Sequence, residues 1–187
     1  CTAATEQQFK DQVGAIRPAG ATRADEGMSL VTSMSSGRSD AKKIVVFFTD
    51  GTPTDFREFK PGVASYAVKD AKSMKDAGAM VYSIGIFQGA DPDIDPVPDS
   101  TSNENKFMHA VSSNYPSATY TEAWDGYKWS FGDRAKGSDG KDATFYKSAT
   151  NADELKHVFD DISKEIIKGA GYPTETSEGC ESTTGYI

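Results

Sequence analysis

The sequence predicts an α/β domain whose mainly parallel sheet lies between layers of helices. Residues 43–48 and 79–87 form short apolar runs rich in branched and aromatic side chains, which is typical of strands buried on both faces. Segments with helical apolar spacing alternate with these runs, and a third strand is expected at 143–147. This alternation favours parallel strands joined by right-handed crossovers.

Five segments have the spacing of amphipathic helices. They are residues 5–16, the segment that carries Ala24, Met28, Val31 and Met34, residues 62–77, residues 106–113, and a last helix with Leu155, Val158, Phe159, Ile162 and Ile166 facing inward. In the first helix we expect Phe9, Val13 and Ile16 to face the core. Gly78 and the cap at 151–154 are the expected boundaries of the third and fifth helices.

The composition limits the classes of partner. The chain has 187 residues and a formal charge of −8, and it has no basic stripe, which argues against nucleic acid and against an anionic lipid surface. No apolar run approaches the roughly 18 residues that span a bilayer, so no membrane insertion is expected, and no signal peptide opens the chain. We therefore expect a mature protein or an excised segment. Cys1 and Cys180 are either a disulfide that joins the two ends or two unpaired thiols.

Ligands of parallel sheets bind beyond the carboxyl ends of the strands. The loops at 50–60 and 88–104 should lie on that rim. The aromatic segment 114–142 looks irregular and should lie on the opposite rim, because it follows a helix and precedes a strand. Its exposed rings, with Trp124, Tyr127 and Trp129 as candidate contact residues, either bind a carbohydrate or protein, or pack on the base of the domain or on a neighbouring module.

Asp50 is the most informative residue, because it ends a buried apolar strand, where a carboxylate is costly unless it is paired or binds a cation. The alternative is a simple Asp-Gly turn. Asp91, Asp93 and Asp95 alternate in a proline-rich loop near the same rim. That spacing suits a second cation site, although the glycine and distal glutamate of an EF-hand loop are missing, and a stiff specificity loop is the other interpretation.

Several motifs together resemble one family. Residues 44–54, Ile-Val-Val-Phe-Phe-Thr-Asp-Gly-Thr-Pro-Thr, look like the strand of von Willebrand factor A (vWA) domains that ends in Thr-Asp-Gly-x-Pro-Thr. Further similar pieces are Gly20-Ala-Thr22, Val81-Tyr-Ser-Ile-Gly-Ile86, Phe107 to Ser113, and Asn151-Ala-Asp-Glu-Leu155 with Phe145 and Phe159. The resemblance implies a three-layer, Rossmann-like vWA domain over residues 1–171, with 114–142 as an aromatic insertion and 172–187 as a linker or the start of an adjacent module.

The resemblance also implies a metal-ion-dependent adhesion site. Thr22 would be a hydroxyl ligand of Mg²⁺ (or Mn²⁺ or Ca²⁺), and Asp50 would hold the ion, through a water. The family's first strand ends in Asp-x-Ser-x-Ser, and that motif is absent from the chain. We therefore expect a domain truncated on its N-terminal side, with a hydrophobic strand edge left open at 43–48 and an incomplete site that need not retain its metal.

Among family members, the chain looks most like the tip adhesins of Gram-positive bacterial pili. This implies a virulence-related, secreted module on a cell-wall-anchored pilus, with stalk modules or pilin subunits beside it and a host matrix or surface protein that offers an acidic residue as ligand. A haloacid-dehalogenase-like phosphatase is the enzymatic alternative, but Phe48 stands where its nucleophilic aspartate would be, so we expect no enzyme. A metal-binding vWA subunit of an intracellular ATP-driven complex is the third interpretation, and the state of the two cysteines would distinguish it.

Overall fold

The computed structural model describes residues 3–15, 17, 20–34, 42–54, 58–137 and 139–169. Its main sheet has three strands, β1 (Ile44–Thr49), β2 (Met80–Gly85) and β5 (Tyr146–Ser148), in the order β1-β2-β5. Both pairs are parallel, with Phe47 opposite Ser83 and Ile84 opposite Lys147. The predicted parallel α/β sheet is therefore confirmed.

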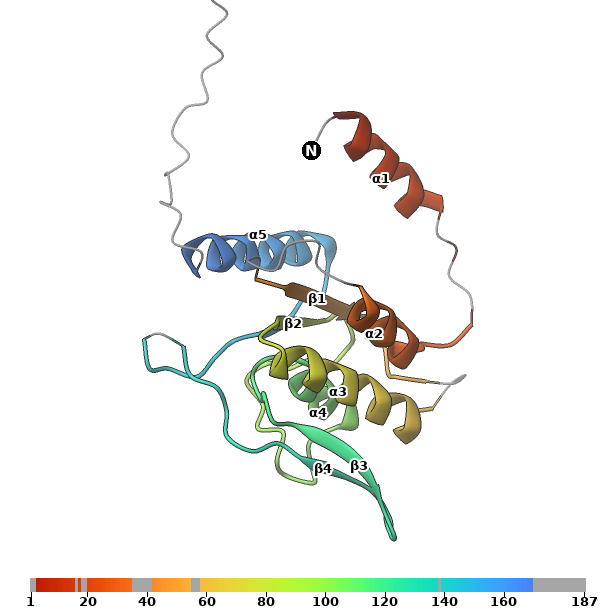
Figure 1. The fold of residues 1–187 in the computed structure, drawn as a ribbon, viewed down its shortest axis with the longest axis vertical. Coiled ribbons are helices and arrows are strands. Elements are labelled where there is room, and N and C mark those ends of the chain that lie inside the picture. Colours follow the sequence, from red (N-terminus) through yellow and green to blue (C-terminus); the bar gives the residue numbers. More distant parts are fainter. Residues whose placement is uncertain are drawn as a thin grey trace, which may run out of the picture.

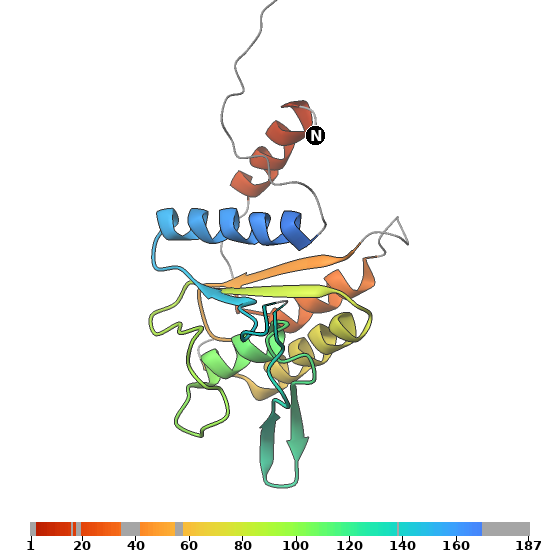
Figure 2. The same ribbon diagram turned by 90° about the vertical axis from the view of Figure 1, so that its left-hand side faces the viewer.

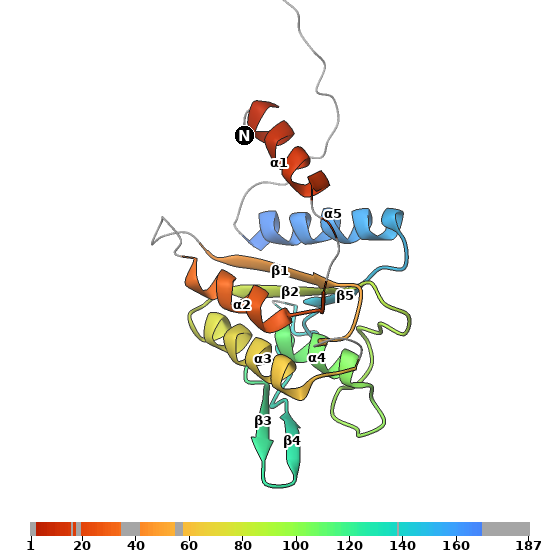
Figure 3. The same ribbon diagram turned by 90° about the vertical axis from the view of Figure 1, so that its right-hand side faces the viewer.

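Helices cover both faces of this sheet. The helices α2 (Ala24–Ser33), α3 (Pro61–Asp76) and α4 (Asn103–Val111) lie on one face, and α5 (Ala152–Gly169) crosses the other, as Figures 2 and 3 show from opposite sides. The predicted three-layer arrangement is thus present in the described residues. It places the carboxyl ends of the strands on one rim, where α3 and α4 also begin.

The core follows the alternation of strand side chains. In β2, Val81 packs towards α3 and α4, whereas Tyr82 and Ile84 pack with Ile162 of α5. All four side chains are buried, and burial of this kind stabilises the fold by about 1.5–3 kcal/mol for each large apolar side chain. Ser83 is the polar exception on the α4 face, and its hydroxyl donates to the Met108 carbonyl oxygen at 2.9 Å.

The ends of two helices follow the predicted signals. Gly78, just after α3, has φ of +84°, a conformation that favours glycine and closes the helix. At the start of α5, the Asn151 side chain accepts a hydrogen bond from the Glu154 backbone N–H at 2.9 Å. These boundaries lie within one or two residues of the expected ones.

The first helix contradicts the sequence prediction. α1 (Ala3–Ala15) stands apart from the layered body in Figure 1. Phe9 and Val13 are 65% and 49% exposed, so their predicted inward orientation is wrong, and Ile16 lies outside the described residues. Met34, expected to face inward at the end of α2, is also exposed. Helical periodicity predicts the helix, but it does not predict whether another part of the molecule covers its apolar face.

Strand β1 is only partly buried, although its sequence predicted burial on both faces. Among the described residues it pairs with β2 alone, so its other edge carries no strand. Phe48 near its end is 59% exposed. The expected open hydrophobic edge is therefore confirmed for the described residues, and the expectation of full burial is wrong for Phe48.

The aromatic segment contains a hairpin that the sequence did not predict. Strands β3 (Thr119–Ala123) and β4 (Gly126–Ser130) pair antiparallel and project from the outer side of the helix layer, away from the sheet (Figure 3). The hairpin packs against α3, and the Trp129 indole N–H donates to Asn103, the first residue of α4, at 3.1 Å. Because α4 begins on the carboxyl rim, the expected location of the whole segment on the opposite rim is wrong.

No helix in the described ranges is long and apolar enough to cross a membrane. Residues 172–187, the predicted linker, and both cysteines, Cys1 and Cys180, lie outside the described residues.

Candidate functional site

The turn after β1 presents Asp50 to solvent. The Thr49 hydroxyl donates to the Gly51 carbonyl oxygen at 2.9 Å and accepts from the Gly51 N–H at 3.2 Å, which closes a tight turn. Asp50 lies at the apex of this turn and is exposed. The described residues include no ion pair or hydrogen-bond partner for its carboxylate. An acidic group without a partner among the described residues thus lies at the carboxyl end of β1.

Thr22 is fixed beside the loop that follows Asp50. The Thr54 N–H donates to the Thr22 carbonyl oxygen at 3.2 Å, and the Thr22 N–H donates to the Thr54 hydroxyl at the same distance. Thr22 is half-buried, two residues before the start of α2. The structure therefore brings the segments of both predicted metal ligands together on one rim, although they are 28 residues apart in the sequence.

These two residues offer two oxygen ligands on the same rim. A hydroxyl and a carboxylate are suitable oxygen ligands for Mg²⁺, which keeps several waters, but they are only two of about six ligands. Within the described ranges, no group of three or more His, Cys, Asp or Glu side chains is arranged to hold a metal ion. The donor types of Thr22 and Asp50 suit such an ion, and the described residues do not supply a full ligand set.

The carboxylates of the loop after β2 have structural partners. Asp91 accepts from the Asp93 N–H at 3.0 Å, and Asp95 accepts from the Val97 N–H at 2.9 Å, so both side chains stabilise local turns. Asp93 is exposed. The loop is also held by the Thr101 hydroxyl, which donates to the Asp95 carbonyl oxygen at 2.6 Å. This geometry favours the interpretation as a stiff loop.

The candidate contact aromatics have different environments. Trp124, at the hairpin tip, is 96% exposed. Trp129 is half-buried and stacks on Tyr120, with ring centroids 3.8 Å apart and an angle of 16° between the planes. Tyr127 is half-buried and lies beside the same Tyr120 ring. Only Trp124 is a fully exposed ring, whereas the other two are fixed by packing.

The first turn of α4 joins the rim segments, and the sequence interpretation missed it. The Thr52 hydroxyl donates to the Glu104 carboxylate at 3.0 Å. The side-chain oxygen of Asn105 (Oδ1) accepts from the Asp91 N–H at 2.9 Å and from the Tyr146 hydroxyl at 2.7 Å. Its side-chain amide nitrogen (Nδ2) donates to the Gly89 carbonyl oxygen at 2.8 Å. A buried asparagine in an amphipathic helix is the signal that could have revealed this junction.

A buried lysine closes the other end of α4. The Lys75 ammonium donates to the carbonyl oxygens of Ala110, Ser112 and Tyr115 at 2.6, 3.0 and 3.1 Å. Burial lowers the pKa of Lys75 to about 7, and the nearby Lys72 charge acts in the same direction. All three ammonium protons are used, so this lysine holds the end of the helix and is not free for a ligand.

His109 is a second buried titratable group in α4. It is fully buried, its ring lies edge-on to Tyr115 and Tyr146, and its Nε2 atom has no hydrogen-bond partner. Burial lowers the pKa of His109 to about 4, with the Arg134 charge acting in the same direction. The ring is therefore neutral at physiological pH and serves as part of the core.

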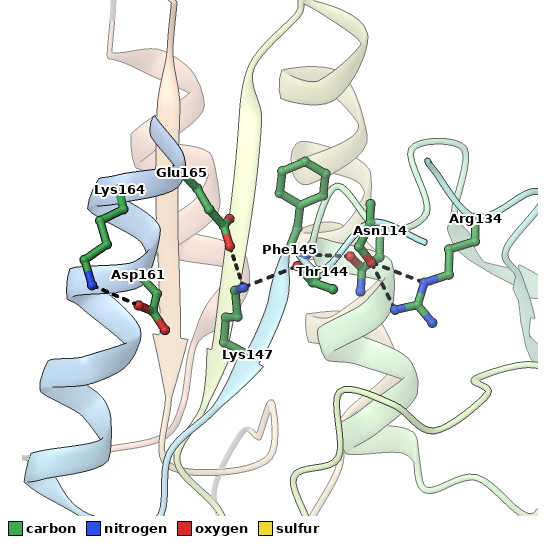
Figure 4. Close-up of polar contacts among 9 residues, drawn as sticks. Asn114, Arg134, Thr144, Phe145, Lys147, Asp161, Lys164 and Glu165 are labelled. Atoms are coloured by element: carbon green, nitrogen blue, oxygen red, sulfur yellow. Dashed lines mark hydrogen bonds and ion pairs between the residues drawn. The ribbon is translucent and has the colours of Figure 1, made fainter. Parts of the chain in front are cut away.

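Polar contacts on the sheet side of the domain anchor β5 (Figure 4). The Phe145 N–H donates to the Asn114 side-chain oxygen at 2.7 Å, and the Arg134 guanidinium donates to the Ala143 carbonyl oxygen. The Lys147 ammonium bonds to Glu165 of α5 at 2.8 Å. These contacts hold β5 against α5 and against the segments that carry Asn114 and Arg134.

A family model for the von Willebrand factor type A domain matches residues 2–122. The matched region contains β1, β2, α2, α3 and α4, together with Thr22 and Asp50. No curated protein and no solved structure matches the chain.

Proposed function

The chain belongs to the von Willebrand factor type A family, and on this premise we propose that it is an extracellular adhesion module that binds a protein ligand at its carboxyl rim. Domains of this family generally mediate protein–protein interactions, often with a metal ion. In this proposal Thr22 and Asp50 are ligands of a divalent cation, Mg²⁺ or its substitutes Mn²⁺ and Ca²⁺. The partner is a host matrix or surface protein that offers an acidic side chain.

The observation that carries the proposal is the free carboxylate of Asp50 beside the fixed Thr22 segment. The hydroxyls of Thr49 and Thr54 and the backbone groups of Thr22 and Gly51 are paired, whereas the Asp50 carboxylate has no partner among the described residues. The chain as a whole has a formal charge of −8. A cation bound beside Asp50 would make this part of the rim locally positive. That charge would attract an acidic group of the partner.

The residues themselves have separate roles in this proposal. Thr22 is neutral, so it contributes a ligand oxygen without cancelling the charge of the ion. Asp50 contributes the charge that holds the ion at the rim. The remaining ligands are waters or groups outside the described residues. A role on a cell-wall-anchored pilus, with neighbouring stalk modules or pilin subunits, is the cellular setting that we propose, and we propose no catalytic activity.

Paramagnetic Mn²⁺ tests the site directly. We expect Mn²⁺ titrated into the isotopically labelled chain to broaden the backbone amide signals of Thr22, Asp50 and Gly51 first. Asp50→Ala should abolish this selective broadening, whereas Asp133→Ala, an exposed carboxylate on another segment, should preserve it. Broadening centred on residues 91–95, or unchanged in Asp50→Ala, would show that the cation binds elsewhere and would overturn the proposal.

The adhesive role needs a second measurement. Surface plasmon resonance on immobilised matrix proteins should show binding in Mg²⁺ that disappears in EDTA and in Asp50→Ala. Binding that is the same in Mg²⁺ and in EDTA would contradict metal-dependent adhesion.

A further inference from the structure

A cavity lies between the β3–β4 hairpin and the proline-rich loop after β2. Its volume is about 480 Å³, and its walls include Val97 and Asp99 of the loop, Lys106 of α4, and Tyr127, Trp129 and Phe131 of the hairpin segment. Neither Thr22 nor Asp50 lines it. It is therefore separate from the proposed metal site, and its volume lies in the range of small-ligand pockets.

Lys106 is an unusual residue in this wall. It is only 6% exposed, yet no hydrogen bond or ion pair joins its ammonium to any described residue. The contrast with Lys75 is informative, because Lys75 is also buried but donates to three carbonyl oxygens. The Lys106 ammonium is not among the buried atoms that lack a partner, so it reaches the cavity that the residue lines. An anionic group of a ligand in the cavity would pair with this ammonium.

The aromatic wall is rigid before any ligand binds. Trp129 stacks on Tyr120 and lies nearly parallel to Phe131, with centroids 5.8 Å apart, and its indole N–H is bonded to Asn103. Opposite this wall, the Val97 N–H bonds to Asp95, which stiffens the loop. Both walls are thus fixed by contacts within the protein, so a ligand would lose little affinity to ordering them.

We propose that this cavity binds an acidic sugar residue, with the sugar carboxylate on Lys106 and the sugar ring against the aromatic wall. The C–H groups of a pyranose ring are weakly positive and suit the negative face of an aromatic ring. Asp99 and Ser130 in the wall can bond to ring hydroxyls. A polyanion such as nucleic acid is disfavoured by the chain charge of −8.

The test uses methyl β-D-glucuronide, with methyl β-D-glucoside as the neutral match and N-acetyl-glutamate amide as the acidic peptide match. Binding is followed by Trp fluorescence and by NMR titration in EDTA, so that the metal site contributes nothing. We expect the glucuronide to bind and to shift the signals of Lys106 and Trp129, and the glucoside to bind at least about 10-fold more weakly. Equal binding of the two sugars, or tighter binding of the peptide match, would overturn the proposal.

Variants separate binding from folding. Lys106→Met should weaken glucuronide binding about 10- to 100-fold, the range for a lost charged hydrogen bond. Its melting temperature should not fall, because methionine keeps most of the apolar stem and the ammonium has no partner among the described residues to lose. Lys69→Met, at an exposed lysine of α3, should change neither property. Unchanged glucuronide binding in Lys106→Met would contradict the assignment. If Lys106→Met does not fold, Lys106→Arg should still bind the glucuronide in preference to the glucoside. Loss of that preference in a folded Lys106→Arg would also contradict the assignment.

Discussion

Replacing Lys75 by methionine should destabilise the domain strongly. Methionine keeps most of the apolar stem but leaves the carbonyl oxygens of Ala110, Ser112 and Tyr115 without their donor. Each buried carbonyl that loses its partner costs about 1 kcal/mol or more. We therefore expect Lys75→Met to lower the free energy of unfolding by about 3 kcal/mol, measured by urea denaturation followed by circular dichroism.

The matched control is Lys72→Met, one turn earlier in α3. Lys72 pairs with Asp76 at 2.7 Å, but both side chains are partly exposed, at 34% and 60%. An exposed pair of this kind contributes no more than about 1 kcal/mol. If Lys75→Met costs no more than Lys72→Met, the three carbonyl contacts do not hold the end of α4, and the reasoning fails.

The pH dependence gives an independent test of Lys75. Its pKa is lowered from 10.5 to about 7 in the folded chain, so between pH 7 and 10.5 the unfolded chain binds more protons. The stability of the wild type relative to Lys75→Met should therefore rise with pH across this window. The slope should be below about 1.4 kcal/mol per pH unit, the limit for one proton, because the three carbonyl oxygens favour the charged form. A relative stability that falls with pH would contradict the effect of burial.

Three further substitutions test the interior and the surface. Because burial lowers the pKa of His109 to about 4, the wild type should lose stability as pH falls from 6.5 towards 4, and His109→Phe should flatten this part of the profile in thermal melts; parallel profiles would contradict the burial argument. Asn105→Leu removes three hydrogen bonds of about 2.7–2.9 Å and should cost about 2–4 kcal/mol, with faster amide hydrogen exchange in the loop after β2; unchanged exchange would show that Asn105 does not hold the loop. Lys147→Met breaks the partly exposed pair with Glu165 and should lower the free energy of unfolding, measured by urea denaturation, by less than about 1 kcal/mol. A larger loss would mean that this contact is a main anchor of α5.

The strands and most helices were predictable from the sequence because their side-chain periods are local properties. β1 and β2 were recognised from apolar runs, and the start of α5 from the cap at Asn151. The pair of segments that carries Thr22 and Asp50 was placed on one rim by the family resemblance. The structure adds the hydrogen bonds between Thr22 and Thr54 that hold those segments together.

The errors arose where position depends on contacts distant in the sequence. The alternation in β3 and β4 was hidden among glycines and charges, and its stabilisation comes from stacking such as that of Tyr120 on Trp129. The orientation of Phe9 depends on whether another surface covers α1, which periodicity does not reveal. The partners of Lys75 and Asn105 come from turns or elements up to about 40 residues away in sequence, so no local pattern marks either residue as an anchor.

The first turn of α4 links the two proposed sites. Asn103 holds the hairpin through Trp129, Glu104 holds the loop after β1 through Thr52, and Asn105 holds the loop after β2. Lys106, the next residue, lines the cavity beside the hairpin. Asp50→Ala should weaken only the metal site, and Lys106→Met should weaken only acidic-sugar binding. Asn105→Leu removes no group that lines the cavity, but it should weaken acidic-sugar binding because Asn105 holds the loop after β2, which supplies Val97 and Asp99 to the cavity wall. Because these four residues follow one another in one helical turn, the positions of the rim loops and of the cavity walls both depend on the start of α4.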